Sequence, residues 1–525
     1  TRYINLYVHG FAPFEKKYGY MLYSDEIWDK FVKKIESNYS LKTYAHFDPY
    51  FDFPSRKNEI KEIVDGSTSK STKSHSFLPF VKILTKTPRY RYLDGEAELG
   101  LDTKIRPISF ASHKDGYIYS FYSFALNELY QNYITSKGFS DAVLAYRTDL
   151  NGKCNIQFAK EVFDVVKTKG ECTAIALDIK GYFDHIDHTI LKEKWCKVLG
   201  KKRLPEDQFK IYESLTKYSY VNRNSILKHF KINLKKKERK GEYWQTLLDL
   251  VPNDLNGLTF KDKFNVLRQR DLIVKNKPKL VDGKIKDLGI PQGSSMSALL
   301  SNIYLIDFDA YISKKAEQMG FTYRRYCDDL LIICKTEQAK DLEKEVIKEI
   351  GKYNLAIQKE KNEVVLFKKN SKGEIRAFDQ KMIDKSETGF NSKNEEAFYT
   401  KLQYLGFEFD GQRVFIRSSS LSRYFRKMKG RIVKTAQMAN SPNSKSDKIF
   451  RQQLLHKYSH LGKRNFLTYA YNAASKFYSN SEGAIKEGMN NPSIRKQVKN
   501  HMEILEGELI KTNSQIKLSK RNKKK

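Results

Sequence analysis

The sequence has few cysteines and no long apolar run, and both absences exclude classes of protein. Its 5 cysteines show no paired spacing, which argues against a zinc module and a disulfide scaffold and fits a reducing cytoplasm. No apolar stretch approaches the ~18 residues that a membrane-spanning helix needs, and the first residues show no secretory signal pattern. The sequence therefore predicts a cytoplasmic protein with no membrane segment.

Acidic residues are scarce relative to basic ones. The chain of 525 residues carries 96 Lys and Arg against 62 Asp and Glu, a formal net charge of +34. An imbalance of this size predicts a polyanionic partner whose affinity falls steeply with salt. Aromatic residues make up 13% of the chain, and many stand beside basic ones. Such rings either stack on single-stranded bases or pack in the core.

Two adjacent acids lie in the segment Tyr326–Leu331, between an aromatic-rich run and an apolar run. This pattern predicts a β-hairpin with Asp328 and Asp329 in its turn. Two carboxylates forced together are costly unless a positive charge lies against them, and a divalent metal ion is the usual solution. A solvated hairpin turn, which aspartate suits well, is the alternative for this segment alone.

A third acid, Asp178, ends the short apolar run of residues 174–177, which is typical of a buried strand. An acid at the end of a strand, beside a hairpin that carries two more, predicts a two-metal phosphoryl-transfer site. Such a site lowers the pKa of an attacking hydroxyl and stabilises the leaving oxygen. Asp184 and Asp187 precede a helical stretch, and we expect them at helix N-termini rather than as further ligands.

A loop and helix of small residues form the third segment, Gly289–Leu305. Proline and glycine punctuate the loop, and small residues open the helix. A loop of this kind can approach a nucleotide or a template base closely, and Gln292 is its candidate nucleotide-binding residue. An ordinary loop-to-helix junction is the alternative, but the order of strand acid, loop-helix and paired-acid hairpin is much harder to explain in that way.

In this order the three segments resemble motifs A, B and C of reverse transcriptases. The resemblance extends over roughly residues 77 to 415. Residues 404–409 resemble the primer-grip hairpin, and Lys361 stands at the position of the motif D lysine. Ala145–Arg147 resemble a fingers segment that contacts the incoming triphosphate, which makes Arg147 a nucleotide-binding candidate.

The resemblance implies an α+β, right-hand polymerase fold with fingers, a palm with an antiparallel sheet, a helical thumb and a basic C-terminal tail. Within the tail, residues 517–525 are expected to be disordered unless RNA orders them. The expected parts are an N-terminal extension and flexible loop at 1–76, fingers at 77–170, palm at 171–415 with a largely helical insertion at about 204–281, thumb at 416–510 and tail at 511–525.

The same resemblance assigns roles to single residues. In the family, the residue five after the metal-binding acid of motif A faces the sugar of the incoming nucleotide. Here it is Phe183, whose ring leaves no room for a 2′-hydroxyl, so deoxynucleotides are implied. The implied cofactor is Mg²⁺, two ions per active site, with Mn²⁺ as an alternative. The implied catalytic and metal-binding residues are Asp178, Asp328 and Asp329, and the nucleotide-binding residues are Phe183, Gln292, Arg147 and Lys361.

Further segments narrow the class of reverse transcriptase. No acidic cluster of an RNase H site follows the primer grip, and the signatures of retron enzymes are not found. Residues 75–80, 155–163 and 458–466 resemble bacterial defence-associated reverse transcriptases, the "unknown group" related to abortive-infection types. This resemblance implies an antiphage role and a cognate noncoding RNA as template or scaffold. It implies dNTPs as substrates and a DNA product, and it allows a homo-oligomer.

Two interpretations from other classes stay open. The first is a group II intron-type or other mobile-element reverse transcriptase, although motif B has Ser297-Ala298 where group II enzymes carry Ser-Pro. The second is a non-catalytic RNA-binding relative on a decayed polymerase scaffold. The intact Asp178, Asp328 and Asp329 argue against it, because a scaffold freed from catalysis has no physical reason to keep three clustered acids.

Overall fold

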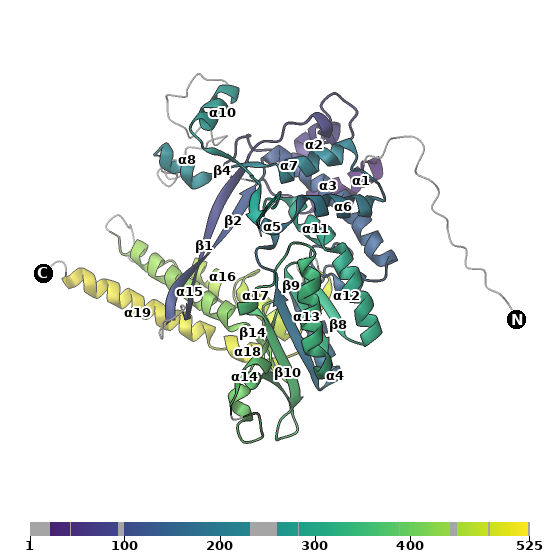
Figure 1. Cartoon of the computed structure of the whole chain (residues 1–525). Coiled ribbons are helices and arrows are strands. Elements are labelled where there is room, and N and C mark those ends of the chain that lie inside the picture. Colours follow the sequence, from purple (N-terminus) through teal and green to yellow (C-terminus); the bar gives the residue numbers. More distant parts are fainter. Residues whose placement is uncertain are drawn as a thin grey trace. The chain divides into compact units, whose positions relative to one another are not determined.

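The chain contains helices and β-sheets in two compact units (Figure 1). A computed structural model describes residues 22–42, 44–92, 99–231, 260–281, 283–387, 389–441, 449–480 and 483–522. With 51% helix and 19% strand, the predicted α+β class is confirmed. The first unit comprises Thr1–Arg147, Lys180–Tyr311 and Glu349–Ala356, and the second comprises Thr148–Ile179, Ile312–Lys348 and Ile357–Lys525.

The first unit has a four-stranded sheet with the strand order β2-β1-β4-β5. β1 (Phe80–Tyr92) and β2 (Leu99–Phe110) form a long antiparallel ribbon. β4 (Ser219–Asn222) pairs in parallel with the start of β1, and β5 (Ile273–Lys275) pairs with β4 in the antiparallel sense. A separate hairpin is formed by β6 (Lys279–Val281) and β7 (Lys284–Lys286).

The helices of the first unit pack around α3 (His113–Ser136), which contacts α1 (Asp25–Ser37), α2 (Phe53–Val64) and α11 (Ser295–Tyr304). The aromatic run that begins at Tyr117 lies in α3 and is buried. Core packing therefore explains these rings, and they are not available for base stacking. The other helices here are α5 (Tyr182–His185), α6 (His188–Leu199), α7 (Glu206–Thr216), α8 (Arg223–His229) and α10 (Phe260–Gln269).

The expected largely helical insertion at about 204–281 contains strands as well as helices in its described residues. It contains the helices α7, α8 and α10, but also the strands β4, β5 and β6. The short β-branched runs around Val221 and Ile273 pair with each other, and Val221 also pairs with Val81 of β1. Pairing with a distant strand stabilises them as strands, which local composition does not reveal. Residues 232–259 lie outside the described residues.

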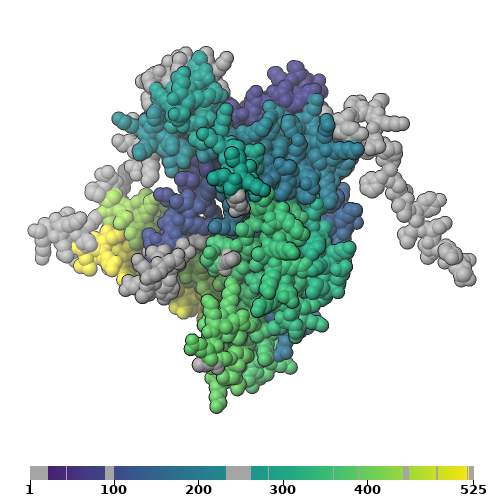
Figure 2. All heavy atoms as spheres, in the orientation of Figure 1, coloured from purple at the N-terminus to yellow at the C-terminus, as the bar shows by residue number. Residues whose placement is uncertain are grey.

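The second unit is built on an antiparallel five-stranded sheet with the order β11-β10-β3-β9-β8. Its middle strand is β3, whose apolar residues are buried as the sequence predicts, apart from the half-buried Ala176. The lighter green surface at the bottom of Figure 2 belongs to this sheet and to segments that follow it. The strands are β3 (Cys172–Asp178), β8 (Thr322–Tyr326), β9 (Asp329–Cys334), β10 (Glu363–Lys369) and β11 (Ile375–Asp379).

A three-stranded sheet of β12 (Leu402–Tyr404), β13 (Phe407–Phe409) and β14 (Val414–Ile416) shares the core of the second unit. α4 (Asn155–Lys169) packs against the three-stranded sheet, where its Phe163 ring stacks on Phe409 of β13 with ring centroids 4.9 Å apart. Three further helices come between and after these strands in the sequence, namely α12 (Ile306–Met319), α13 (Ala339–Gly351) and α14 (Gln380–Lys385).

The C-terminal part of the second unit is helical. α15 (Ser418–Ala439) buries Tyr424, Met428, Ile432 and Ala436, which lie on one helix face. α19 (His501–Asn522) packs against α15 and buries Leu505 and Leu509. The remaining elements are α16 (Arg451–Tyr458), α17 (Phe466–Ala474), α18 (Pro492–Val498) and the hairpin of β15 (Phe477–Ser479) and β16 (Ile485–Glu487).

The prediction of a disordered basic tail is wrong for residues 517–522. α19 continues to Asn522, and Thr512 is still buried. A helix that is already held by Leu505 and Leu509 can extend at little further cost, because each added residue gains one backbone hydrogen bond. Residues 523–525 lie outside the described residues. Among the described residues, no helix combines the length and the apolarity needed to cross a membrane.

Candidate active site

Three aspartates, Asp178, Asp328 and Asp329, meet at one end of the five-stranded sheet and are called the acid cluster below. Asp178 is the last residue of β3 and Asp329 is the first of β9, and the two are direct partners in the antiparallel register. Directly opposite residues point to the same face of a sheet, so these two carboxylates lie on one side. The backbone carbonyl of Asp328 accepts a hydrogen bond from the N–H of Ile179 at 3.0 Å.

The turn between β8 and β9 consists of Cys327 and Asp328 alone. Tyr326 pairs with Asp329 across the hairpin, so the prediction that both acids lie in the turn is wrong for Asp329. Cys327 has a φ of +59°, in the left-handed region, which is costly for a residue with a side chain. The fully buried Arg325 donates to the Cys327 carbonyl at 3.1 Å and supports this turn. Sequence analysis missed Arg325, because arginine in a short strand is usually exposed.

The acid cluster concentrates negative charge at the surface end of the sheet, where Asp178 and Asp328 are half-buried and Asp329 is exposed. Desolvation raises the pKa of Asp329 to about 7, and the neighbouring Asp328 and Asp178 contribute to the rise. The positive charges of Arg417 and Lys361 lower the Asp329 pKa, but by less than desolvation and the two neighbouring acids raise it. Near neutral pH, full ionisation of the cluster is therefore opposed by repulsion that an added cation would relieve.

Lys361 is the predicted nucleotide-binding residue that the structure brings to the acid cluster. Its ammonium forms an ion pair with the Asp178 carboxylate. The backbone supports this position, because the N–H of Gln358 donates to the Asp178 carbonyl at 2.8 Å and Ile357 forms a bridge with Ile179. The segment that carries Lys361 is thus hydrogen bonded to the end of β3.

Phe183 and Gln292 lie in the first unit and are linked to each other. The N–H of Ile290 donates to the Phe183 carbonyl at 3.0 Å, so the loop of Gln292 is joined to the short helix α5 that carries Phe183. The N–H of Ser109 donates to the Gln292 carbonyl at 2.7 Å. Gly293 has a φ of +117°, and a Cβ there would come within 2.8 Å of the Ser109 carbonyl oxygen. Glycine is therefore needed for the close approach of this loop to β2.

Arg147, the remaining nucleotide-binding candidate, also lies in the first unit. Its guanidinium donates to the backbone carbonyls of Ser140 and Val143, the latter at 3.2 Å. These contacts hold the loop that precedes Arg147. Asp187 caps α6 by accepting hydrogen bonds from two backbone N–H groups, as predicted for a helix N-terminus.

The sequence matches the family described as reverse transcriptase (RNA-dependent DNA polymerase) over residues 101–409, more than half of the chain. This protein belongs to the reverse transcriptase family. It is therefore an RNA-directed DNA polymerase with the right-hand polymerase fold. An RNA template, dNTPs and a DNA product are the substrates and product of that activity. No curated protein matches the sequence.

Solved structures similar to this reverse transcriptase include two telomerases. One is telomerase from Candida albicans in complex with a TWJ fragment of telomeric RNA, at 12% identity and a TM-score of 0.31, covering 93% of this chain and 70% of that chain. The other is apo telomerase from Candida tropicalis, at 12% identity and a TM-score of 0.35, covering 91% and 72%. The structural similarity to these telomerases is low, and the family assignment rests on the sequence match over residues 101–409.

Reverse transcriptase domains generally use divalent metal ions, and the acid cluster has the matching chemistry. Carboxylate oxygens are the ligands that Mg²⁺ and Mn²⁺ prefer, and the charges of Asp328 and Asp178 add to the desolvation that raises the Asp329 pKa. In the described part of the chain, no group of three or more His, Cys, Asp or Glu side chains has the arrangement of a formed metal site. The Lys361 ammonium is the cation paired with Asp178 here.

A basic groove of about 880 Å³ lies in the helical C-terminal part of this reverse transcriptase. None of its lining residues is acidic. Three of its cations follow one face of α15 and are called the α15 cation row: Arg423, Lys427 and Arg431. Lys463 and Arg464 line the groove from the loop before α17. Within the described residues, no ion pair joins any of these five cations to a carboxylate, so their charge is available to a phosphate backbone.

The loop with Lys463 and Arg464 is held in a strained shape. Arg464 has a φ of +55°, and a Cβ on Gly462 would lie 1.7 Å from the His456 carbonyl oxygen. The side-chain amide of Asn465 closes the loop by donating to the carbonyls of His456 and Ser459 at 3.0 and 2.8 Å. A strained but well-bonded loop presents its two cations in a defined place.

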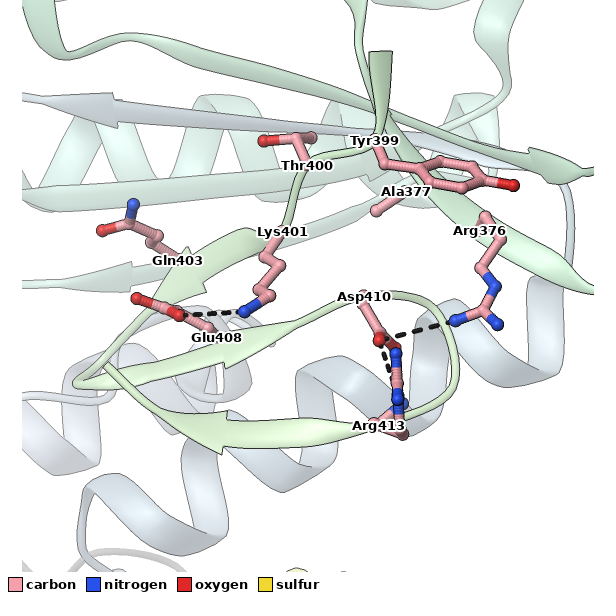
Figure 3. Close-up of a pocket in the computed structure, with 9 residues that line it drawn as sticks. All are labelled: Arg376, Ala377, Tyr399, Thr400, Lys401, Gln403, Glu408, Asp410 and Arg413. Carbon is pink, nitrogen blue, oxygen red and sulfur yellow. Dashed lines mark hydrogen bonds and ion pairs between the residues drawn. The ribbon is translucent and has the colours of Figure 1, made fainter. Parts of the chain in front are cut away.

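A second pocket, of about 370 Å³, lies against the three-stranded sheet that carries the predicted primer grip (Figure 3). Its charged side chains neutralise one another, unlike those of the basic groove. Asp410 accepts from Arg413 at 2.9 Å and faces Arg376 at 3.5 Å, and Lys401 lies 3.6 Å from Glu408 (Figure 3). These ion pairs connect β11, β13 and the strand ends around them, and so support the hairpin of β12 and β13.

Proposed function

We propose that the acid cluster is the catalytic centre of this reverse transcriptase. The observation that carries the proposal is the register pairing of Asp178 with Asp329, with Asp328 adjacent and the Asp329 pKa raised to about 7. Three carboxylates that repel one another at the end of a sheet are suited to hold two Mg²⁺ ions, with Mn²⁺ as the alternative. When bound, the ions would activate the primer hydroxyl and stabilise the leaving pyrophosphate.

The protein residues around the cluster perform the remaining tasks in this proposal. The carboxylates of the acid cluster would bind the metal ions once Asp329 has lost its proton. Lys361 keeps a positive charge beside Asp178, where its ammonium can donate a hydrogen bond to a phosphate oxygen. Arg417 adds a further positive charge that acts on Asp329.

Selection of the sugar is assigned to Phe183. Its ring excludes a 2′-hydroxyl by occupying the space that this group needs, and a packed site cannot shift to admit an extra oxygen. The hydrogen bond from Ile290 to the Phe183 carbonyl ties this residue to the loop of Gln292. A nucleotide held by that loop would therefore meet the Phe183 ring at a defined position.

The polyanionic partner is proposed to be a cognate noncoding RNA, and the biological role is antiphage defence in the cytoplasm. The net charge of +34 and the unpaired cations of the basic groove support an RNA partner. The likeness of residues 75–80, 155–163 and 458–466 to defence-associated reverse transcriptases supports the role. Residues 458–466 include the loop that presents two of the groove cations.

The catalytic proposal is tested by primer extension on an RNA template with dNTPs and Mg²⁺. Wild type should make DNA, and the double variant Asp328→Ala/Asp329→Ala should make none while it binds the template–primer with unchanged affinity. Glu387→Gln, which removes an exposed acid of the same unit, is the matched control and should keep full activity. Extension by the double variant at a rate close to wild type would refute the assignment.

The partner and the role are tested in cells. Protein purified after a moderate-salt wash should carry one RNA of defined sequence, together with DNA copied from it. The host that expresses the protein and this RNA should resist phage infection, and the Asp328→Ala/Asp329→Ala variant should abolish resistance. Recovery of only heterogeneous cellular RNA, or equal plating of phage on both hosts, would contradict this part of the proposal.

A further inference from the structure

The basic groove combines its cations with aromatic rings. Tyr424, Tyr458 and Phe466 line it together with the α15 cation row. The Phe466 ring stacks on Tyr424 with ring centroids 4.7 Å apart, and the Tyr424 hydroxyl donates to the Tyr458 carbonyl at 2.8 Å. The two tyrosines are buried and Phe466 is half-buried. Phe466 is therefore the ring of this set that a bound molecule can reach, and its stacking on Tyr424 fixes its orientation.

Neutral polar side chains line the same groove. Gln452 and His456 stand one helical turn apart on α16, and both are exposed. A glutamine amide donates and accepts hydrogen bonds, as does a neutral imidazole, so both can bond to the edge of a nucleic-acid base. Ser420 adds a hydroxyl from the start of α15. The groove thus offers stacking, hydrogen bonding and positive charge in one place.

The loop that carries Lys463 and Arg464 is also held from α19. His501, the first residue of α19, is buried, and its Nδ1 lies 2.7 Å from the Val498 carbonyl. A carbonyl only accepts, so Nδ1 carries the proton and Nε2 accepts from Nδ1 of His460, which lies 3.1 Å away. A loop held in this way loses little conformational freedom when its cations bind a ligand.

The groove follows the helix that begins near the acid cluster. Arg417 directly precedes α15, its N–H donates to the Gly406 carbonyl at 3.0 Å, and its charge acts on Asp329. With a rise of about 1.5 Å per residue, Arg423 lies about 9 Å and Arg431 about 21 Å along the helix from Arg417. All these residues belong to the second unit. A strand bound in the groove is thus held close to the proposed catalytic centre.

The size and the lining of the groove favour an unpaired strand over a duplex. Concave sites of about 300 to 1,000 Å³ enclose ligands of drug size, so a groove of about 880 Å³ takes in roughly one or two nucleotides with their bases. In a duplex the bases are stacked on one another, and only the backbone and the base edges are exposed. Phe466 would then meet no base face. In an unpaired strand the base faces are free to stack on an aromatic ring.

We propose that the basic groove binds an unpaired segment of the RNA partner, with one base stacked on Phe466. The phosphates of this segment lie against the α15 cation row, Lys463 and Arg464, and Gln452 and His456 bond to base edges. The inference rests on the proposed function, which makes the partner an RNA. It deepens that function, because the RNA enters the groove single-stranded and is held by its bases as well as by its charge.

The experiment measures the affinity of the full chain for short synthetic RNAs by fluorescence anisotropy, without dNTPs or Mg²⁺. The two probes are an unstructured single strand and a duplex with the same number of phosphates. Phe466→Leu keeps an apolar side chain against Tyr424 but removes the flat ring. It should weaken binding of the single strand by roughly tenfold, the scale of one base-stacking contact, and leave binding of the duplex within about twofold. The salt dependence should not change, because no cation is removed.

Two further variants control for effects on folding. Phe477→Leu replaces a phenylalanine that is 57% exposed in the β15–β16 hairpin, outside the groove lining, and should bind both probes as wild type does. Gln452→Ala/His456→Ala removes two exposed side chains and leaves the aromatic packing intact. This double variant should weaken binding of the single strand selectively, even if Phe466→Leu lowers the melting temperature.

The outcomes separate the groove assignment from the proposed function. An equal loss on both probes, or no loss on either, in Phe466→Leu and in Gln452→Ala/His456→Ala would overturn the proposal. A larger loss on an unpaired DNA than on the RNA of the same sequence would assign the groove to the DNA product and overturn it as well. Failure of wild type to extend a primer would refute the proposed function instead, because the binding of these probes involves no synthesis.

Discussion

Replacing Asp329 by asparagine should stabilise the metal-free protein while it abolishes DNA synthesis. The Asp329 pKa lies at about 7 in the folded protein, against 3.8 for an ordinary aspartate. A shift of roughly three pKa units would correspond to about 4 kcal/mol of folding free energy at pH 8 in a dry site. Because the Asp329 side chain is exposed, solvent screening keeps the actual loss well below that figure. The loss arises because Asp329 must ionise in a desolvated position beside Asp328 and Asp178. Asparagine has nearly the same shape and cannot ionise, so Asp329→Asn avoids this cost.

The sign of the pH dependence follows from the direction of the pKa shift. An acid whose pKa is raised in the folded state destabilises the fold above its unfolded pKa. The stability gain of Asp329→Asn should therefore be close to zero near pH 3.5, grow up to about pH 7 and stay constant above it. Thermal and denaturant unfolding in EDTA at pH 3.5, 5 and 8 measure the gain, with Glu387→Gln as the control that should show none.

Divalent metal provides the second arm of this test. Mg²⁺ should raise the melting temperature of wild type at pH 8, because a bound cation compensates the three carboxylates. Mg²⁺ should raise the melting temperature of the Asp329→Asn variant much less. The reasoning would be refuted if the variant were no more stable than wild type at pH 8 in EDTA, or if its gain were the same at pH 3.5.

Three further substitutions test other parts of the site. Asp178→Ala should reduce primer extension to background while circular dichroism and template affinity, measured by filter binding, stay as in wild type. Phe183→Ala should raise the ratio of rNTP to dNTP incorporation by roughly tenfold or more in single-nucleotide extension. Tyr182→Phe, which removes a buried hydrogen bond to the Ser301 carbonyl, should leave the ratio unchanged and cost about 1 kcal/mol of stability. Replacing the α15 cation row by glutamine should lower RNA affinity and flatten the log–log salt dependence by about 2 to 3, and an unchanged slope would place the RNA elsewhere.

Much of the candidate site could be predicted from short segments. Asp178 after an apolar run, the paired acids Asp328 and Asp329, and the glycine-flanked Gln292 are recognisable because each depends on residue types at close spacing. The predicted strand before Asp178 and the predicted hairpin around Asp328 are both present. The mixed fold also follows from local patterns, since buried strands and amphipathic helices differ in their apolar period.

Other features depend on residues far apart in the sequence, and local patterns could not reveal them. β4 pairs with β1 although the two are more than a hundred residues apart, so a segment expected as helix contributes strands. α19 remains helical to Asn522 because buried Leu505 and Leu509 hold it against α15, whereas composition alone favoured disorder. The burial of Arg325 beneath the acid-bearing turn depends in the same way on the packing around it.

The sequence by itself determined which residues could do the chemistry, because metal binding and sugar selection each require particular side chains. Only the tertiary structure decided how they combine. The register of β3 and β9 places Asp178 opposite Asp329, and the segment after α13 brings Lys361 to the same carboxylate. Desolvation then raises the Asp329 pKa, which no linear pattern contains. Backbone hydrogen-bond register and desolvation are properties of the assembled sheet, and they turn three separate acids into one site.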